Sequence, residues 1–433
     1  MRIALNYRNV DPDRGGAETY VADLTRSLIA RGHQVTLVAE SVKSGCVPVT
    51  TRILKVPVKG FGRSSKIWSF ARNSEAVLRA HETEFDATMG FINTWHHDVI
   101  IPQGGLRAGS ILHNAERFRS PLRRTVYGAL KRLSPSEWKY DRIEREQYSP
   151  ERKARVVAVS RLVAGHLERF RGVDPERIHV VYNAIDPDRF HVDDHDAVRQ
   201  ETRQKYGLTA DEHVGLFVGH NFWLKGLEPL LRAMARHKAK AASKTDSNCQ
   251  PLRLLVSGRG KLKPFHKMVD QLGLQDEVLL LGFTPDIRSL FHASDFFVSP
   301  TYYDPCSLVV MEALACGLPV ITTSCNGAGE IMTNGREGFV VPSPNHEQEL
   351  TAALSQMTDR QLRHEMARNA TELGRAQTFE VHVSHLEAIF REVATNKRPQ
   401  HGESKLGLSN PHFQAINEHS LNPSKESDRG RFS

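Results

Sequence analysis

A repeated alternation of short apolar strands with amphipathic helices most constrains the fold of this chain. Residues 2–7, RIALNY, predict a buried strand, residues 15–33 a helix with one apolar face, and residues 34–40 a second strand. After a polar stretch, residues 213–221, HVGLFVGHN, begin the same alternation again. Because neighbouring parallel strands need such crossover connections, the pattern predicts an α/β protein with two Rossmann-like, doubly wound sheets.

The junction between the two predicted sheets lies near Asn183, where IHVVYN gives way to a turn rich in Pro and Asp. The predicted domains are therefore residues 1–182 and residues 183–375. We expect a last amphipathic helix over residues 376–394 to complete the first domain. Residues 395–433 are polar and contain few large apolar side chains, so we expect a disordered tail.

The cysteines and the apolar runs indicate in which cellular compartment the protein is expected. No run approaches the roughly 18 apolar residues of a membrane-spanning helix, and the first ten residues, MRIALNYRNV, are too short and polar for a signal peptide. The five cysteines form no CxxC pair, which favours neither a zinc site nor a disulfide framework. We therefore expect a cytoplasmic protein.

The net charge of +8 is concentrated in residues 107–155, where thirteen Lys and Arg face six Asp and Glu. Apolar side chains are interleaved with the basic ones: Phe118, Leu122, Val126, Tyr127, Leu130, Leu133 and Trp138. This pattern is typical of a helix that lies on an anionic membrane, although a solvated helix packed on its own domain is the alternative. No nucleic-acid-binding motif accompanies the charge, so we expect no nucleic-acid partner.

Polar and glycine residues follow several of the predicted strands. Gly15 and Gly16 come after the first strand, Lys225 follows HVGLFVGHN, Arg259 follows RLLVS, and Asp304 follows DFFVSP. Ligands of such sheets bind outside the carboxyl ends of the strands. We therefore expect these residues to line one ligand site.

Glu312 is a carboxylate within an otherwise apolar run from Leu308 to Cys316. Burying it costs several kcal/mol unless it is hydrogen-bonded. Helical side chains lean toward the helix N-terminus, which directs Glu312 toward Asp304, and N–H groups at a helix start favour anions. The cluster predicts a polyhydroxyl ligand that carries phosphate. A structural Glu bonded to backbone is the alternative.

The spacing of Asp304 and Glu312, with ALACGLPVITT after them, resembles the E-x7-E signature of retaining glycosyltransferases of family 4, which have the GT-B fold. GGAE near the start, VVYNAIDPDRF at the junction and FWLKGLEPLLRAM in the second domain agree with it. The resemblance covers roughly residues 1–394. Among branches, the chain looks most like the lipopolysaccharide core glucosyltransferase I group, on the MGF strand followed by His97 and Asp98, the WLKGL segment and the basic region.

The resemblance implies a role for each matching residue. Glu312 would bind the nucleotide ribose, Asp304 would contact the donor sugar, and Lys225 would bind the pyrophosphate. Gly15 and Gly16 would form the glycine loop that approaches the diphosphate and sugar, and Asp98, with His97, would lie beside the reacting sugar. Backbone groups of Cys306, Ser307 and Leu308 would hold sugar hydroxyls and phosphate.

The chemistry of the leaving group supports these roles. A departing nucleoside diphosphate needs positive charge, for which Lys225 is the principal candidate. Arg259 is a second candidate, although an arginine in a surface turn is the alternative. Cations and helix N-termini make a metal unnecessary, so we predict metal independence and no cofactor beyond the nucleotide sugar. The resemblance implies retention by front-face attack, so we name no protein nucleophile. The chain departs from the family in carrying Asp304 for Glu, Ser307 for Gly and His220 for Arg.

These observations predict a retaining, metal-independent hexosyltransferase at the inner face of the membrane. The expected donor is UDP-glucose, and the expected acceptor is a lipid-linked saccharide such as a lipopolysaccharide core. Two alternatives stay open. The same fold can act on a soluble sugar or sugar-phosphate acceptor, or the chain can be a catalytically idle, membrane-associated carbohydrate-binding protein.

Overall fold

The first half of the molecule is built on a seven-stranded sheet. The computed structural model describes residues 1–190, 194–243 and 251–397. All neighbouring strands of this sheet are parallel, in the order β5-β3-β1-β6-β7-β8-β9. The strands are β1 (Arg2–Asn6), β3 (Gln34–Ala39), β5 (Arg52–Lys55), β6 (Ala87–Gly90), β7 (Val99–Ile100), β8 (Arg155–Ala158) and β9 (Ile178–Val180). A separate small pair joins β2 (Asn9–Val10) to β4 (Ser41–Val42).

The second half is built on a six-stranded sheet, also parallel throughout, in the order β12-β11-β10-β13-β14-β15. Its strands are β10 (His213–Val218), β11 (Leu252–Ser257), β12 (Val278–Gly282), β13 (Phe296–Ser299), β14 (Val320–Thr323) and β15 (Gly338–Val341). In each sheet the strand order reverses once, between β1 and β6 and between β10 and β13. The prediction of two doubly wound sheets is therefore confirmed.

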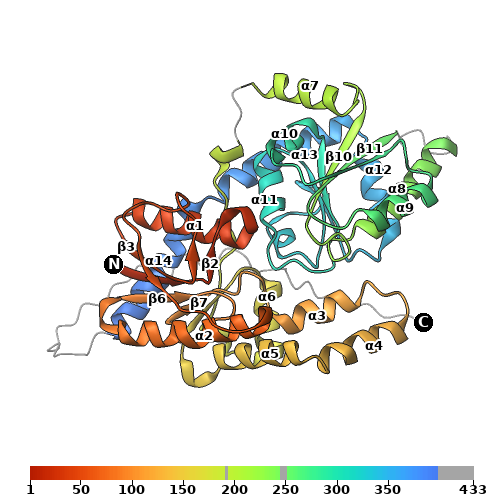
Figure 1. Ribbon diagram of the computed structural model, residues 1–433. Coiled ribbons are helices and arrows are strands. Elements are labelled where there is room, and N and C mark those ends of the chain that lie inside the picture. The colour runs from red at the N-terminus through yellow and green to blue at the C-terminus, as the bar shows by residue number, and fades with distance from the viewer. Residues whose placement is uncertain (191–193, 244–250, 398–433) are drawn as a thin grey trace, which may run out of the picture. The chain divides into compact units, whose positions relative to one another are not determined.

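Helices connect the strands of both sheets (Figure 1). Those of the first half are α1 (Gly16–Ala30), α2 (Gly62–Ala80), α3 (Arg107–Ala115), α4 (Pro121–Arg132), α5 (Pro135–Gln147) and α6 (Arg161–Arg171). Those of the second half are α7 (His195–Lys205), α8 (Leu227–Ser243), α9 (Lys263–Leu272), α10 (Ile287–Ala293), α11 (Leu308–Ala315), α12 (Glu347–Gln356) and α13 (Arg360–Ala376). No helix in these ranges or in α14 (Phe379–Lys397) is long and apolar enough to cross a membrane.

The last helix, α14, contacts residues of the first half. His382 Nε2 lies 2.6 Å from the Tyr20 hydroxyl, and Arg31 Nε donates to Glu387 at 2.8 Å. These contacts agree with a C-terminal helix that completes the first domain, whose bounds stay a prediction. The helix runs to Lys397, past the predicted end at residue 394. Most of the predicted disordered tail, from residue 398 onward, lies outside the described residues.

The core strands are short apolar runs buried on both faces, as helices on both sides of a parallel sheet require. In β1, Ile3, Ala4 and Leu5 are fully buried, and the buried Asn6 donates from Nδ2 to Ser74 Oγ at 3.0 Å. The strand ends point to the same edge of each sheet. At a reversal of strand order, the helices leave on opposite faces of the sheet, and the resulting crevice is where such folds bind ligands.

Candidate active site

Lys225 and Asp304 meet at the point where the second sheet reverses its strand order. Lys225 follows β10 and Asp304 follows β13, and these two strands are neighbours. The Lys225 ammonium forms an ion pair with the Asp304 carboxylate, and Asp304 is only 8% exposed. The structure thus brings together two residues that the sequence predicted at one site. The pair holds a cation and an anion within the same crevice.

Glycine at 226 lets the Lys225 loop approach the end of β13. Gly226 has a φ of 78°, a left-handed conformation that favours glycine. A Cβ atom on Gly226 would lie 1.8 Å from the carbonyl oxygen of Pro300, which is backbone and cannot move aside easily. A side chain at this position would therefore displace the loop that carries Lys225.

Two further basic residues stand near Lys225. His220 follows β10 and Arg259 follows β11, and the Arg259 guanidinium lies over the Phe283 ring at 4.0 Å. Desolvation lowers the pKa of His220, and the positive charges of Arg259 and Lys225 lower it further. The surroundings of His220 therefore favour its neutral form.

Glu312 is partly buried in α11, and its carboxylate forms no hydrogen bond or ion pair with the described residues. Burial raises the pKa of Glu312 to about 7, an effect that Arg189 opposes and Asp23 reinforces. Arg189 itself lies 3.8 Å from Asp23. The alternative of a structural Glu bonded to backbone is not what the structure contains.

The Glu312 side chain lines a small cavity of ≈20 Å³, about the room that one water molecule needs. Its walls come from α1, the 184–190 segment, α11 and α14, and Asp304 is not among the lining residues. Glu312 therefore faces α1 and Arg189, whereas we expected it to point toward Asp304. The difference arises because the 184–190 segment passes beside α11, while Asp304 pairs with Lys225.

The glycine loop approaches the start of α11. Gly16 begins α1, directly after Gly15, and a Cβ on Gly16 would lie 3.0 Å from Cδ1 of Leu308. A larger residue at 16 would crowd Leu308. The structure thus places Gly16, directly after Gly15, against Leu308 at the start of α11.

Asn326 and Asn183 organise the segment from Asp304 to Leu308, and sequence reasoning missed both roles. Asn326 Oδ1 accepts from Ser307 N at 3.2 Å and from Ala328 N at 3.1 Å. Asn183 Nδ2 donates to the Cys306 carbonyl at 2.8 Å. Ser307 N and the Cys306 carbonyl are thus already hydrogen-bonded within the protein. Of the predicted backbone donors, the N–H of Leu308 and the next residues of α11 are the ones directed outward from the helix start.

Asp98 is held at the amino end of β7, where its Oδ2 accepts from Thr88 N at 2.7 Å and from Thr88 Oγ1 at 2.8 Å. This carboxylate ties β7 to β6 and lies at the strand ends opposite the ligand edge. Neighbouring His97 is buried beside Gly90, and burial holds the pKa of His97 well below its usual value. Neither His97 ring nitrogen has a hydrogen-bond partner in the described residues. The role of Asp98 beside the reacting sugar stays a prediction.

The basic segment forms α3, α4 and α5, and α4 has no buried residue. Leu122 is 73% exposed, Leu130 64% and Leu133 71%. Trp138 on α5 is also exposed, whereas Phe118 and Tyr127 are partly buried. Leu122, Leu130 and Leu133 are therefore not packed on their own domain, as the solvated-helix alternative required, whereas Tyr127 packs against Phe118. A hollow of ≈1000 Å³ lies between these three helices.

Two parallel α/β halves with a crevice at their strand reversals define a GT-B type of molecule, and comparison with known families identifies it further. Residues 14–189 match the model described as Glycosyltransferase Family 4, and residues 198–373 match the model described as Glycosyl transferases group 1. The chain therefore belongs to the GT-B glycosyltransferases of group 1 and family 4, as the signature at Asp304 and Glu312 predicted.

Curated relatives include enzymes with different acceptors. The chain is 25% identical over 360 residues to the lipopolysaccharide glucosyltransferase WaaG of Escherichia coli K12, which covers 82% of this chain and 90% of that protein. It is 29% identical over 420 residues to the D-inositol 3-phosphate glycosyltransferase of Rhodococcus jostii RHA1, covering 91% of this chain and 88% of that protein.

Solved structures share the fold. A crystal structure of WaaG, a glycosyltransferase involved in lipopolysaccharide biosynthesis, matches with a TM-score of 0.71 at 23% identity, covering 91% of this chain and 99% of that one. Anabaena Alr3699/HepE in complex with UDP and glucose matches with a TM-score of 0.63 at 20% identity, covering 92% and 99%. The predicted GT-B fold is confirmed.

Proposed function

We propose that this chain is a retaining hexosyltransferase that moves glucose from UDP-glucose to a lipid-linked saccharide such as a lipopolysaccharide core. The observation that carries the proposal is the Glu312 carboxylate, which is partly buried and without an intramolecular partner. An unpartnered carboxylate in such a place is costly unless a ligand satisfies it. The two hydroxyls of a ribose are donors that suit its two oxygens.

The diphosphate of the donor binds next to Lys225 and Arg259 in this proposal. In the free protein, Asp304 neutralises Lys225. An arriving diphosphate competes for the ammonium group, which frees Asp304 to accept hydrogen bonds from hydroxyls of the donor sugar. The positive charge then stabilises the leaving group as negative charge develops on it. We therefore propose that no metal ion is needed.

We propose retention by front-face attack, without a protein nucleophile. The bond between the anomeric carbon and the phosphate oxygen breaks as the acceptor oxygen bonds to the same face of that carbon. The proton of the acceptor hydroxyl passes to the departing phosphate. In this scheme the loop of residues 91–98 begins after β6 at the ligand edge, beside the sugar, and Asp98 ends it at the opposite strand ends. Since Thr88 already occupies Asp98 Oδ2, we propose that Asp98 acts by fixing that loop.

The acceptor is proposed to reach the enzyme at the cytoplasmic face of a membrane. Helix α4 presents Leu122, Leu130 and Leu133 to solvent, in a segment rich in Arg and Lys. Such a helix can insert its apolar side chains between acyl chains while its basic residues contact anionic headgroups. This arrangement would hold the crevice close to a lipid-linked saccharide.

A soluble sugar-phosphate acceptor is the second candidate. The chain's similarity to D-inositol 3-phosphate glycosyltransferases favours it, because these relatives are slightly more identical to the chain than WaaG is. Their names specify a small phosphorylated acceptor. In that case the exposed apolar residues of α4 would serve another purpose, and no membrane would be needed for activity.

A transfer assay separates the two acceptors. Purified protein is given UDP-[14C]glucose with either truncated lipopolysaccharide in phospholipid vesicles or D-inositol 3-phosphate in solution. The proposal predicts label in the lipid fraction and none in a soluble glucosyl-inositol phosphate. Label in the soluble product alone would establish the second candidate. Inversion at the anomeric carbon of the product, read from its proton coupling constant, would contradict retention.

A further inference from the structure

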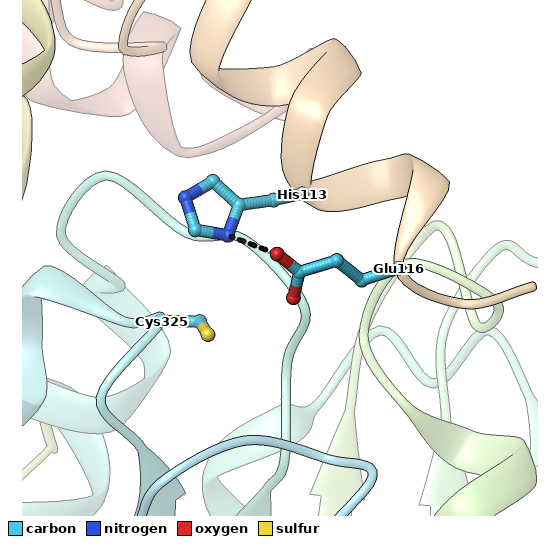
Figure 2. Close-up of side chains that lie close together, drawn as sticks. All are labelled: His113, Glu116 and Cys325. Carbon is cyan, nitrogen blue, oxygen red and sulfur yellow. Dashed lines mark ion pairs between the residues drawn. The ribbon is translucent and has the colours of Figure 1, made fainter. Parts of the chain in front are cut away.

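Three side chains with metal-binding atoms converge where α3 contacts the loop after β14 (Figure 2). His113 lies in the last turn of α3, Glu116 follows it by about one helical turn, and Cys325 lies just beyond β14. Their ligand atoms all lie within 4.8 Å of one another. Figure 2 shows the imidazole and the carboxylate facing each other, with the sulfur turned toward the same space. The proposed transfer reaction uses none of these side chains.

The neighbours of the His113 ring hold it with Nδ1 directed toward Glu116, as a metal ligand would be. It stacks on Tyr303 with 5.3 Å between centroids, and its Nε2 lies 3.3 Å from His166 Nε2. That contact needs one donor and one acceptor. With His113 Nε2 as the donor, Nδ1 carries a free lone pair directed at Glu116 Oε1, 3.9 Å away. Nδ1 is buried and has no hydrogen-bond partner in the described residues. A second ring nitrogen held by a neighbour is usual for histidine ligands.

The other two ligands are held in place by the second half of the molecule. The Glu116 carbonyl accepts from Asn345 Nδ2 at 3.2 Å, and the Cys325 carbonyl accepts from Asp304 N at 3.0 Å. Asn326, directly after Cys325, is fully buried and hydrogen-bonded. Tetrahedral zinc places its N, O and S ligands roughly 3.3 to 3.8 Å apart, given bonds of about 2.0 to 2.3 Å. Small side-chain rotations would bring the three atoms to that spacing.

The geometry points to a Zn²⁺ site in which His113 Nδ1, the Glu116 carboxylate and Cys325 Sγ are three ligands and the fourth position is open. Imidazole and thiolate favour Zn²⁺ over Mg²⁺ and Ca²⁺, which prefer oxygen ligands alone. Because the Cys325 backbone is bonded to Asp304, the ion would tie α3 to the loop that carries the Lys225–Asp304 pair. The site would hold the crevice in one arrangement rather than take part in the transfer.

Cobalt binding to the full chain tests this site directly. Co²⁺ takes zinc positions and gives a charge-transfer absorption band when a thiolate binds it. The wild-type protein should show this band, saturating at one equivalent and lost on addition of Zn²⁺. Cys325→Ser should abolish the band and weaken Zn²⁺ binding, measured by competition with a chelating dye, at least about tenfold. Cys316→Ser, the matched control directly after α11, should change neither.

Two further variants keep the test decisive if Cys325→Ser folds poorly. Glu116→Gln and His113→Gln leave all thiols in place, and each should weaken Zn²⁺ binding about tenfold or more. A wild-type protein without a thiolate band would overturn the site, as would a band that survives in Cys325→Ser. Equal loss of the band in Cys316→Ser, or unchanged Zn²⁺ affinity in Glu116→Gln, would overturn it too. The assay measures no sugar transfer, so it is independent of the proposed function.

Discussion

At the scale of single residues, Glu312 is held where the folded protein disfavours its charge. Its pKa is raised to about 7 by burial, against an ordinary value of 4.5. The folded state therefore binds a proton at Glu312 more tightly than the unfolded chain does. This contribution to stability is complete below about pH 4.5 and is lost as the pH rises through about 7. The charged form of Glu312, which the proposed ribose contact requires, therefore destabilises the folded protein.

Glu312→Gln should separate the two effects. The variant carries no charge at 312, so its free energy of unfolding relative to wild type should increase from pH 5 to pH 8, by roughly 1 to 2 kcal/mol. Urea unfolding at both pH values measures this. The same variant should bind UDP at least about tenfold more weakly in calorimetry, because the ribose loses a charged acceptor. Unchanged UDP affinity would remove Glu312 from the nucleotide site. The charged groups facing it are Asp23 and Arg189.

At the scale of elements, α4 is a helix without a buried face. Its apolar side chains lie in solvent beside Arg123, Arg124 and Arg132. Leaving several large apolar side chains exposed on one short helix is unfavourable unless another surface covers them. The basic residues of this segment would favour an anionic covering surface, as the proposed membrane contact requires.

The double variant Leu130→Glu/Leu133→Glu tests the membrane role of α4. We expect wild type to sediment with vesicles containing anionic phosphatidylglycerol and to be released by salt. The double variant should lose most of this binding while keeping its melting temperature, because both positions are exposed. Val381→Glu, an exposed apolar position on α14, is the control and should bind like wild type. Equal loss in the control, or no binding by wild type, would remove α4 from the membrane.

Helix α14 carries a buried carboxylate, Glu387, that pairs with two basic residues of the first half of the molecule. Hydrogen bonds from Arg31 and His33 lower the pKa of Glu387 to about 2, and the side chain is only 6% exposed. Its stabilising effect is therefore present above the ordinary pKa of 4.5 and is lost as the pH falls toward 2.

Glu387→Gln should cost roughly 2 to 3 kcal/mol of unfolding free energy at pH 7, and clearly less at pH 3. Thermal melts at the two pH values measure the difference. Glu392→Gln is the matched control on the same helix, because its pair with Arg155 is more exposed and should be worth under about 1 kcal/mol. Equal losses in the two variants, or a Glu387→Gln loss independent of pH, would contradict this assignment.

At the scale of the whole molecule, the repeated apolar runs were sufficient to predict two parallel sheets. Each buried strand is visible as a short apolar run in the sequence. Parallel strands are joined by right-handed crossover connections, which limits how the runs can be arranged. Lys225 and Asp304 were predictable as members of one site because both follow strands, whereas their ion pair was not. Which strands are neighbours, and hence where each sheet reverses, depends on packing between distant segments.

Contacts between distant segments account for the features that the sequence did not predict. The hydrogen bonds from Thr88 that fix Asp98 follow from the register of β6 and β7. Glu312 faces Arg189 because the 184–190 segment passes beside α11. His113 and Cys325 lie far apart in the sequence, so no local spacing could indicate that they meet. Side-chain direction and long-range contact are set by the folded structure as a whole.

The central claim, that Lys225 and its neighbours make a metal-independent nucleotide-sugar site, is tested most directly by release of UDP from a panel of nucleotide sugars. Wild type should release UDP from UDP-glucose at the same rate with and without added Mg²⁺ or Mn²⁺. Lys225→Ala should slow release about 10²- to 10³-fold, as loss of one group that stabilises the leaving group does. Lys238→Ala, which breaks an exposed ion pair with Glu277, is the control and should keep the wild-type rate. Release that requires added Mg²⁺ or Mn²⁺, or that persists unchanged in Lys225→Ala, would contradict the account.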